Sequence, residues 1–107
     1  MLDQASFDAL RLCDAHLTGI EWKESGRDLC IALASASGTP VTIVCAWAHS
    51  LQIDLKTSAH RGGHPLTWEA MLTPQGDGWR LVLDFAGDGS IELLCNGVFV
   101  AEAGHGR

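Results

Sequence analysis

The stretch QGDGWRLVLDFAGDGSIELLCNG, residues 75–97, decides the fold class of this chain. In its first strand-like run, Trp79, Leu81, Leu83 and Phe85 form one side, and Arg80, Val82 and Asp84 form the other. A period of two is typical of a β-strand with one buried face and one wetter face. Each apolar run follows a Gly-Asp-Gly turn, and so short a repeat leaves no room for a crossover helix between strands. The stretch therefore predicts neighbouring antiparallel strands.

The same alternation continues on the N-terminal side of this stretch. It recurs in five further segments, which are TGIEWKE (18–24), DLCIALA (28–34), PVTIVCAW (40–47), SLQIDLK (50–56) and LTWEAML (66–72). Turn-forming Gly, Pro, Asn and Asp residues separate these segments at short intervals. Asn96-Gly97 also lies between two apolar runs, and both residues tolerate the positive φ of a type I′ turn. We predict a hairpin at this dipeptide.

The N-terminus follows a different pattern. In SFDALRLCDA, residues 6–15, apolar residues lie near helical spacing, and Asp3 and Ser6 are both suitable N-caps. We therefore predict a mainly β fold, a single antiparallel sandwich or strongly curved sheet of about eight strands, with one short N-terminal helix. The predicted single domain spans residues 1–107, divided into a short helical N-terminus (1–15), an antiparallel β meander (16–103) and a flexible tail (104–107).

Charge limits the partners that this chain is expected to bind. Thirteen acidic residues against seven basic ones leave a net charge of −6, and the Lys and Arg residues occur singly. Phosphate backbones and anionic lipids need concentrated positive charge, so neither nucleic acid nor a membrane is an expected partner. The start MLDQASFDALRL lacks the features of a signal peptide, and no apolar run approaches the roughly 20 residues that span a bilayer. We expect a cytoplasmic protein.

Four cysteines, Cys13, Cys30, Cys45 and Cys95, are expected to be free thiols, as is usual in the cytoplasm. None belongs to a Cys-x-x-Cys pair. The last three lie inside apolar runs, where cysteine behaves as a small apolar residue. We predict that these three thiols are buried and structural.

The polar segment SAHRGGHPLTWE, residues 58–69, raises the question of a metal or anion site. Positions four apart on a strand are roughly 13 Å apart, whereas a zinc ion holds its ligands at about 2.0 to 2.3 Å. Cys45 and His49 can share an ion only if the chain turns between them. His60 and His64 need a closing loop, and no third ligand is assured. We predict no metal and no cofactor, and interpret the segment as an exposed loop between strands.

The sequence contains no motif for catalysis. It lacks Gly-x-Ser-x-Gly, the phosphate-binding Gly-x-x-x-x-Gly-Lys and the dinucleotide fingerprint. Its serines lie mostly in turns, and apolar neighbours disfavour thiolate formation at three of the four cysteines. We therefore predict that the protein is not an enzyme.

Four tryptophans, Trp22, Trp47, Trp68 and Trp79, are in phase with the aliphatic residues of their own strands. Core packing is the first interpretation, because aromatic residues dominate the energetics of small domains. A tryptophan-lined pocket between sheet and helix is the alternative. The candidate residues for binding a partner or ligand are His49, His60, Arg61, His64 and Trp68.

The segment CDAHLTGIEWKESGRDLCIALA, residues 13–34, resembles the opening of several small bacterial β-rich domains, some from the immunity-protein families of polymorphic toxin systems. The residues that match are Asp14, Ala15, Leu17, Ile20, Trp22, Gly26, Leu29, Ile31 and Leu33. The closing segment GSIELLCNGVFVAEA, residues 89–103, is similar to theirs as well. The family often has His before Asp-Ala, where this chain has Cys13. The resemblance implies a β-rich binding or inhibitory module without catalytic residues.

Together these patterns predict a non-enzymatic acidic interaction module, such as an immunity-type inhibitor of a protein partner. The alternative is a β domain that binds a small molecule in a tryptophan-lined cavity. Several strands carry apolar residues on their second face, for example Val82 and Phe99, and an exposed apolar patch usually marks an interface. We therefore also predict a homodimer, formed by sheet faces or by edge strands near the C-terminal hairpin.

Overall fold

The computed structural model describes residues 1–35, 37–55, 66–85 and 89–101. Within these residues the chain forms one α-helix, one 3₁₀ helix and eight strands. They are α1 (Gln4–Asp8), β1 (His16–Lys23), η1 (Glu24–Gly26), β2 (Asp28–Ala34), β3 (Pro40–Ala46), β4 (His49–Leu55), β5 (Glu69–Gln75), β6 (Gly78–Asp84), β7 (Gly89–Cys95) and β8 (Gly97–Ala101). No helix in this described part of the chain is long and apolar enough to cross a membrane.

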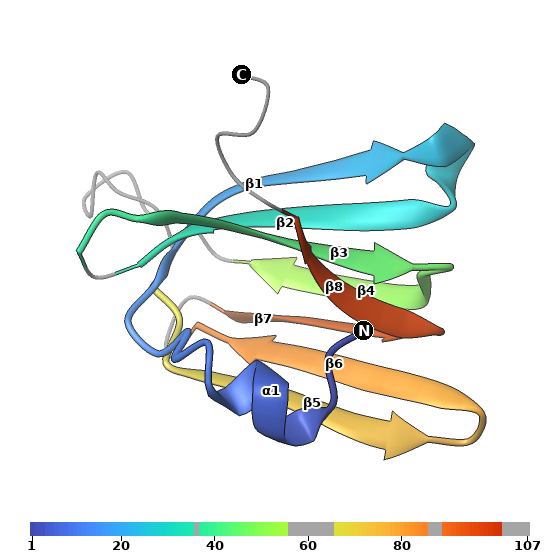
Figure 1. The fold of residues 1–107 in the computed structure, drawn as a ribbon. Coiled ribbons are helices and arrows are strands. Elements are labelled where there is room, and N and C mark those ends of the chain that lie inside the picture. Colours follow the sequence, from blue (N-terminus) through green and yellow to red (C-terminus); the bar gives the residue numbers. More distant parts are fainter. Residues whose placement is uncertain (36, 56–65, 86–88, 102–107) are drawn as a thin grey trace.

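The strands form two four-stranded antiparallel sheets that share one core (Figure 1). Sheet A has the strand order β1-β2-β3-β8, and sheet B has the order β4-β7-β6-β5. The predicted fold class, a mainly β sandwich of eight strands with one short N-terminal helix, is confirmed. The predicted tail, residues 104–107, lies outside the described residues.

The alternation of the sequence places one face of each central strand in the core. Leu29, Ile31 and Leu33 of β2 are buried, whereas Cys30 between them is half-buried on the outer face, so the prediction of a buried Cys30 is wrong. The rest of the core consists of Phe7, Leu12, Ala15, Leu17, Ile43, Cys45, Leu72, Leu81, Leu83, Phe85, Ile91, Leu93, Cys95 and Val98. Burying one large aliphatic side chain contributes roughly 1.5 to 3 kcal/mol, so this set holds the two sheets together.

The helix α1 is anchored at its start and on one face. The carboxylate of Asp3 accepts a hydrogen bond from the N–H of Ser6 at 2.8 Å, which is the predicted N-cap. Phe7 is 2% exposed and fixes the helix beside β5 (Figure 1). The helix is shorter than the sequence predicts, because turns follow it and Arg11 adopts a positive φ of 52°.

A bent two-stranded ribbon joins the sheets. The chain passes from β3 into β4 and from β7 into β8, and each passage leads from one sheet to the other. Ala46 pairs with Gly97 in sheet A and His49 pairs with Leu94 in sheet B, which leaves two residues on each chain between the pairs. The N–H of Asn96 donates to the carbonyl oxygen of Ala46 at 2.9 Å. The pairing of β3 with β8 therefore continues into the pairing of β4 with β7 without a shift in register at the bend.

The predicted hairpin at Asn96-Gly97 is wrong. The strands β7 and β8 belong to different sheets, and they pair with β4 and β3 instead of with each other. Neither Asn96 nor Gly97 has a positive φ, whereas Trp47 on the opposite chain of the ribbon does. The pairing of β7 with β4 and of β8 with β3 along their lengths overrides the local turn preference of Asn-Gly. Tertiary context commonly overrides local propensities in this way.

The chain also links the two sheets at the opposite side of the sandwich. The N–H of Asp14 donates to the carbonyl of Thr67 at 2.7 Å, and the N–H of Thr67 donates to Ala15 at 2.8 Å. His16 and Leu66 continue this contact as an isolated bridge. The start of β1 is therefore tied to the segment that leads into β5.

Candidate functional site

An exposed tryptophan marks the bend between the sheets. Trp47 directly follows β3, is 57% exposed, and has a φ of 57°, a left-handed conformation that is unusual for a bulky residue. Such a conformation costs of the order of 1 to 3 kcal/mol, and strain of this kind concentrates at functional sites. The Trp47 corner comprises Arg27, Asp28, Trp47, His49 and Asn96.

Asp28, the first residue of β2, holds the corner together. Its carboxylate accepts two hydrogen bonds from the Arg27 guanidinium, both at 2.9 Å, and one from the backbone N–H of Trp47 at 3.2 Å. The N–H of Ala48 adds a hydrogen bond to the carbonyl of Arg27 at 3.0 Å. The turn between β1 and β2 is therefore bonded to the bend between β3 and β4.

The same contacts fix the protonation state of Asp28. The hydrogen bonds from Arg27 lower the pKa of this carboxyl below its ordinary value of 3.8, and the Trp47 N–H lowers it further against the opposing effect of burial. The pairing also raises the pKa of Arg27. Asp28 is therefore an anion throughout the neutral range and acts as a structural acceptor.

Arg27 also contacts the indole ring. Its guanidinium carbon lies 5.2 Å from the centroid of the Trp47 ring, within the range of a cation–π interaction. The two hydrogen bonds to the Asp28 carboxylate hold the guanidinium in place beside the indole ring. More than half of Trp47 nevertheless remains exposed. The corner presents an aromatic surface that is oriented before any partner arrives.

His49 lies beside the ring at the start of β4. Its Nδ1 is 3.1 Å from the carbonyl oxygen of Trp47, and because a carbonyl only accepts, Nδ1 carries the proton in this contact. The neutral ring then presents Nε2 as an acceptor. A surface hollow of about 510 Å³ next to it is lined by Trp47, Arg27, His49 and Asn96, among others. A second hollow of about 200 Å³ beside Trp79 shares His49 and Asn96.

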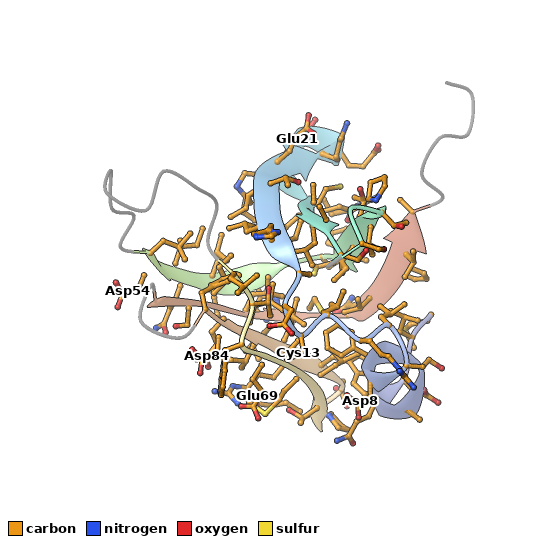
Figure 2. All side chains as sticks on the ribbon, turned by 90° about the vertical axis from the view of Figure 1, so that its left-hand side faces the viewer. Asp8, Cys13, Glu21, Asp54, Glu69 and Asp84 are labelled. Atoms are coloured by element: carbon orange, nitrogen blue, oxygen red, sulfur yellow. The ribbon has the colours of Figure 1, made fainter. Side chains whose placement is uncertain are left out.

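Trp68 belongs to a different hollow, between the helix and sheet B. It is 65% exposed, and its carbonyl accepts a hydrogen bond from the thiol of Cys13 at 3.1 Å. The hollow has a volume of about 290 Å³, and its lining includes Asp8, Cys13 and Glu69, which Figure 2 labels on the helix, the following turn and β5. This is the place where the sequence suggested a tryptophan-lined pocket, and of the described residues one tryptophan lines it.

Trp68 and His49 do not form one site. Trp68 directly precedes β5. At that end of sheet B, one row of paired residues runs across all four strands, from the first residue of β5 to Asp54 on β4. Asp54 is five positions from His49 along β4, which is roughly 16 Å at about 3.3 Å per residue. The strands β4 and β5 are also the two opposite edges of sheet B. The two predicted residues therefore lie at opposite ends and on opposite edges of one sheet.

The remaining predicted residues give no metal or anion site. His60, Arg61 and His64 lie outside the described residues. Cys45 is fully buried whereas His49 is exposed, so these two side chains do not converge on an ion. Across the described ranges, no group of three or more His, Cys, Asp or Glu residues is placed to hold a metal.

The predicted packing of the tryptophans in the core is wrong for three of the four. Trp22, Trp47 and Trp68 are 45%, 57% and 65% exposed, and Trp79 is half-buried against the core. Each exposed tryptophan is in phase with apolar residues that face the core from its own strand, but it stands near the end of β1, after β3 or before β5. A period of two predicts the direction of a side chain, but not how far along the strand the core extends.

Sequence reasoning did not identify Arg27, Asp28 or Asn96 as binding residues, although it singled out Asn96 as part of a predicted turn. The contact between Asp28 and Trp47 spans 19 positions of the chain, and no local pattern indicates it. The one usable signal was the polar Ala-His-Ser stretch, residues 48–50, which interrupts the alternation directly after Trp47.

Comparison with known proteins supports the fold. No protein-family model and no curated protein sequence matches the chain. Among solved structures, the chain is similar to the crystal structure of an uncharacterized protein from Neisseria gonorrhoeae, with a TM-score of 0.68. The similarity covers 84% of this chain and 92% of that chain at 12% sequence identity, and at this identity it concerns the fold alone.

Proposed function

We propose that the protein is a non-enzymatic binding module that recognises a protein partner through the Trp47 corner. The observation that carries the proposal is the exposed Trp47 ring, held in a strained backbone conformation by Asp28 and Arg27. Tryptophan and arginine are among the residues that most often dominate the energy of protein–protein binding. Orienting them before the partner arrives reduces the entropy lost on association.

The groups at the corner suit binding better than catalysis. General acid–base catalysis works best with a pKa near the working pH, whereas Arg27 lowers the pKa of Asp28. The Asp28 carboxylate already accepts hydrogen bonds from both Arg27 and Trp47. His49 and Asn96 add polar groups to the rim of the hollow beside the ring. An aromatic centre with a polar rim is the arrangement that protein interfaces use.

The charge of the chain favours a basic partner. The net charge is −6, and the outer face of sheet B carries Asp54, Glu69 and Asp84 in one row of paired residues, together with the ion pair of Arg80 and Glu92. Opposite charge steers a partner toward such a surface, and the gain in association rate falls as salt rises. The specific form proposed is an immunity-type inhibitor of a basic toxin. We place it in the cytoplasm, where four free cysteines remain reduced.

A peptide library tests the corner without the natural partner. Because few side chains dominate a recognition surface, short peptides can capture much of its binding energy. Random peptides displayed on phage are selected on the wild-type protein, and the enriched peptides are titrated calorimetrically against the wild type, Trp47→Ala and Trp68→Ala. The Trp68 variant is the matched control, since Trp68 is even more exposed but lies at the far end of sheet B. Weakened binding to Trp47→Ala alone supports the proposal, and unchanged binding overturns it.

The immunity form has its own test in cells. The protein is expressed together with the product of the gene next to its own, under separate control. Growth that wild type restores and Trp47→Ala does not restore supports an immunity role. Growth arrest that wild type fails to relieve overturns the immunity form, and the peptide titration still decides whether the corner binds a protein.

The hollow beside Trp47 favours a second candidate function, binding of a small molecule. Its volume of about 510 Å³ lies within the range of ligand pockets, and an aromatic ring, an imidazole and an amide line it. A library of small aromatic and polar fragments is tested by saturation-transfer NMR on the wild type and on Trp47→Ala. A fragment that binds the wild type alone supports this function, and equal signals from both proteins contradict it.

A further inference from the structure

The two outer faces of the sandwich differ in chemistry. On sheet B, Asp54, Glu69 and Asp84 lie in one row of paired residues, and Figure 2 places all three along that sheet, well away from Glu21 on sheet A. The outer face of sheet A has two rows of small or apolar residues, Cys30–Val44–Phe99 and Ala32–Thr42–Ala101. These six residues define the sheet A face.

The sheet A face carries both an exposed aromatic side chain and a hollow. Phe99 on the edge strand β8 is 42% exposed. A hollow of about 650 Å³ on the same face is lined mainly by residues of β1, β2 and β3, including Gly19, Cys30 and Val44. A Cβ built on Gly19 would meet no atom within 4 Å, so the β1 side of the hollow is open. A two-fold dimer pairs one patch with itself, so the exposed Phe99 of each copy would face the hollow of the other.

Charge favours a second copy on this face over the outer face of sheet B. Among the described residues, the charged ones that line the hollow are Glu21 and Lys23, and their side chains lie 3.5 Å apart. These two charges offset each other, as Arg80 and Glu92 do on the outer face of sheet B, but that face also carries Asp54 and Glu69 in a chain of net charge −6. Contact through sheet A leaves the acidic faces of both copies on the outside, where their mutual repulsion is smallest.

The size of the face sets the strength of the contact. Four strands about 4.8 Å apart, with about six residues of about 3.3 Å each, cover roughly 400 Å². Burial on both copies then removes at least roughly 800 Å², compared with about 1,600 Å² for a standard stable interface. The edge of β8 is partly occupied, because the N–H of Leu2 donates to the carbonyl of Val98 at 2.7 Å. Within the described part of the chain, the face is therefore left open, whereas this edge is partly covered.

From these observations we infer that the sheet A face binds a second copy of the chain, in a weak two-fold dimer. The dimer uses a surface other than the Trp47 corner, so it does not depend on the proposed recognition of a partner. Added salt strengthens it, since screening reduces the repulsion between two acidic chains.

Sedimentation equilibrium over a wide concentration series tests the dimer. The average mass of the wild type is expected to rise from 11.4 kDa toward twice that value. Phe99→Asp places a charge on the face and is expected to weaken association at least tenfold. Val82→Asp is the matched control, because Val82 is half-buried on the outer face of sheet B. A wild-type mass that stays at 11.4 kDa, or dissociation by Val82→Asp and not by Phe99→Asp, overturns the inference.

The thiol of Cys30 gives a second readout that needs no substitution. Cys30 is half-buried on the sheet A face, and burial raises its pKa, so its alkylation is slow but measurable. The dimer covers this thiol, and its alkylation rate is therefore expected to fall several-fold as protein concentration rises. The exposed Cys13 lies away from the face and serves as the internal reference. Equal concentration dependence of the two thiols contradicts a dimer through this face.

Discussion

The Arg27 guanidinium lies 5.2 Å from the centre of the Trp47 ring and is bonded at the same time to the carboxylate of Asp28. That carboxylate also accepts the backbone N–H of Trp47, so the ring and its backbone share one anchor. Arg27 and Asp28 lie where the turn after β1 enters β2, and Trp47 lies in the bend between β3 and β4. These two segments meet only when β2 and β3 are paired. The geometry of the proposed binding surface therefore depends on the folded sandwich as a whole.

Removing the charge of Asp28 should lower stability at neutral pH and reduce its sensitivity to acid. The folded-state pKa of Asp28 lies below the ordinary 3.8, so its contribution is fully present above about pH 4 and is lost as pH falls through the folded pKa. Thermal unfolding of the wild type and Asp28→Asn at pH 7 and pH 3 measures this. The wild type should lose more of its Tm on acidification than the variant does.

Asp3 provides the control for that experiment. Its hydrogen bonds with Ser6 also lower its pKa, but it caps α1 and is no part of the Trp47 corner. Asp3→Asn should therefore reduce acid sensitivity without changing peptide binding at the corner. The role assigned to Asp28 is wrong if Asp28→Asn and the wild type lose the same Tm between the two pH values.

Thr67 is a position where a substitution should stabilise the protein. Its side-chain hydroxyl is buried and has no hydrogen-bond partner among the described residues. An unpaired buried hydroxyl costs roughly 1 to 3 kcal/mol, and valine has nearly the same shape without it. Thr67→Val should raise the free energy of unfolding by about 1 kcal/mol in a urea titration. Thr67→Ser keeps the hydroxyl and loses a methyl group, so it should be less stable than the wild type.

The thiols of Cys45 and Cys95 should resist labelling in the folded protein. Cys45 of β3 and Cys95 of β7 belong to different sheets and are both buried in the shared core. The neighbouring thiol of Cys95 and burial raise the pKa of Cys45. A thiol reagent followed by mass spectrometry should modify Cys13 first, and Cys45 and Cys95 only after urea is added. Rapid labelling of either buried thiol in native buffer would refute this packing.

The alternation of apolar and polar residues predicts the strands well, because the apolar positions are the ones that face the core. In β2, Leu29, Ile31 and Leu33 alternate in the sequence and are all buried in the structure. Such a pattern depends only on neighbouring residues of one strand, and a strand keeps its inward face whichever strand it pairs with. The fold class and the number of strands could therefore be predicted without knowing the strand order.

The Trp47 corner could not be predicted, because it arises from contacts between distant segments. Asn96-Gly97 has the local chemistry of a hairpin, yet the pairing of β3 with β8 carries the chain into the other sheet. Trp47 fits the period of β3, but its positive φ turns it out of the core. Local patterns contain neither the strand order nor the end of the core, and the corner depends on both.

The affinity of a selected peptide for Trp47→Ala, compared with the wild type, is the most direct test of whether the Trp47 corner binds a protein partner. Loss of a dominant interface side chain costs about 2 kcal/mol or more, which corresponds to a Kd roughly 30-fold weaker. We expect a loss of this size for Trp47→Ala, with the Tm nearly unchanged and with Trp68→Ala binding as the wild type does. Peptides that bind Trp47→Ala and the wild type with equal affinity would contradict this expectation.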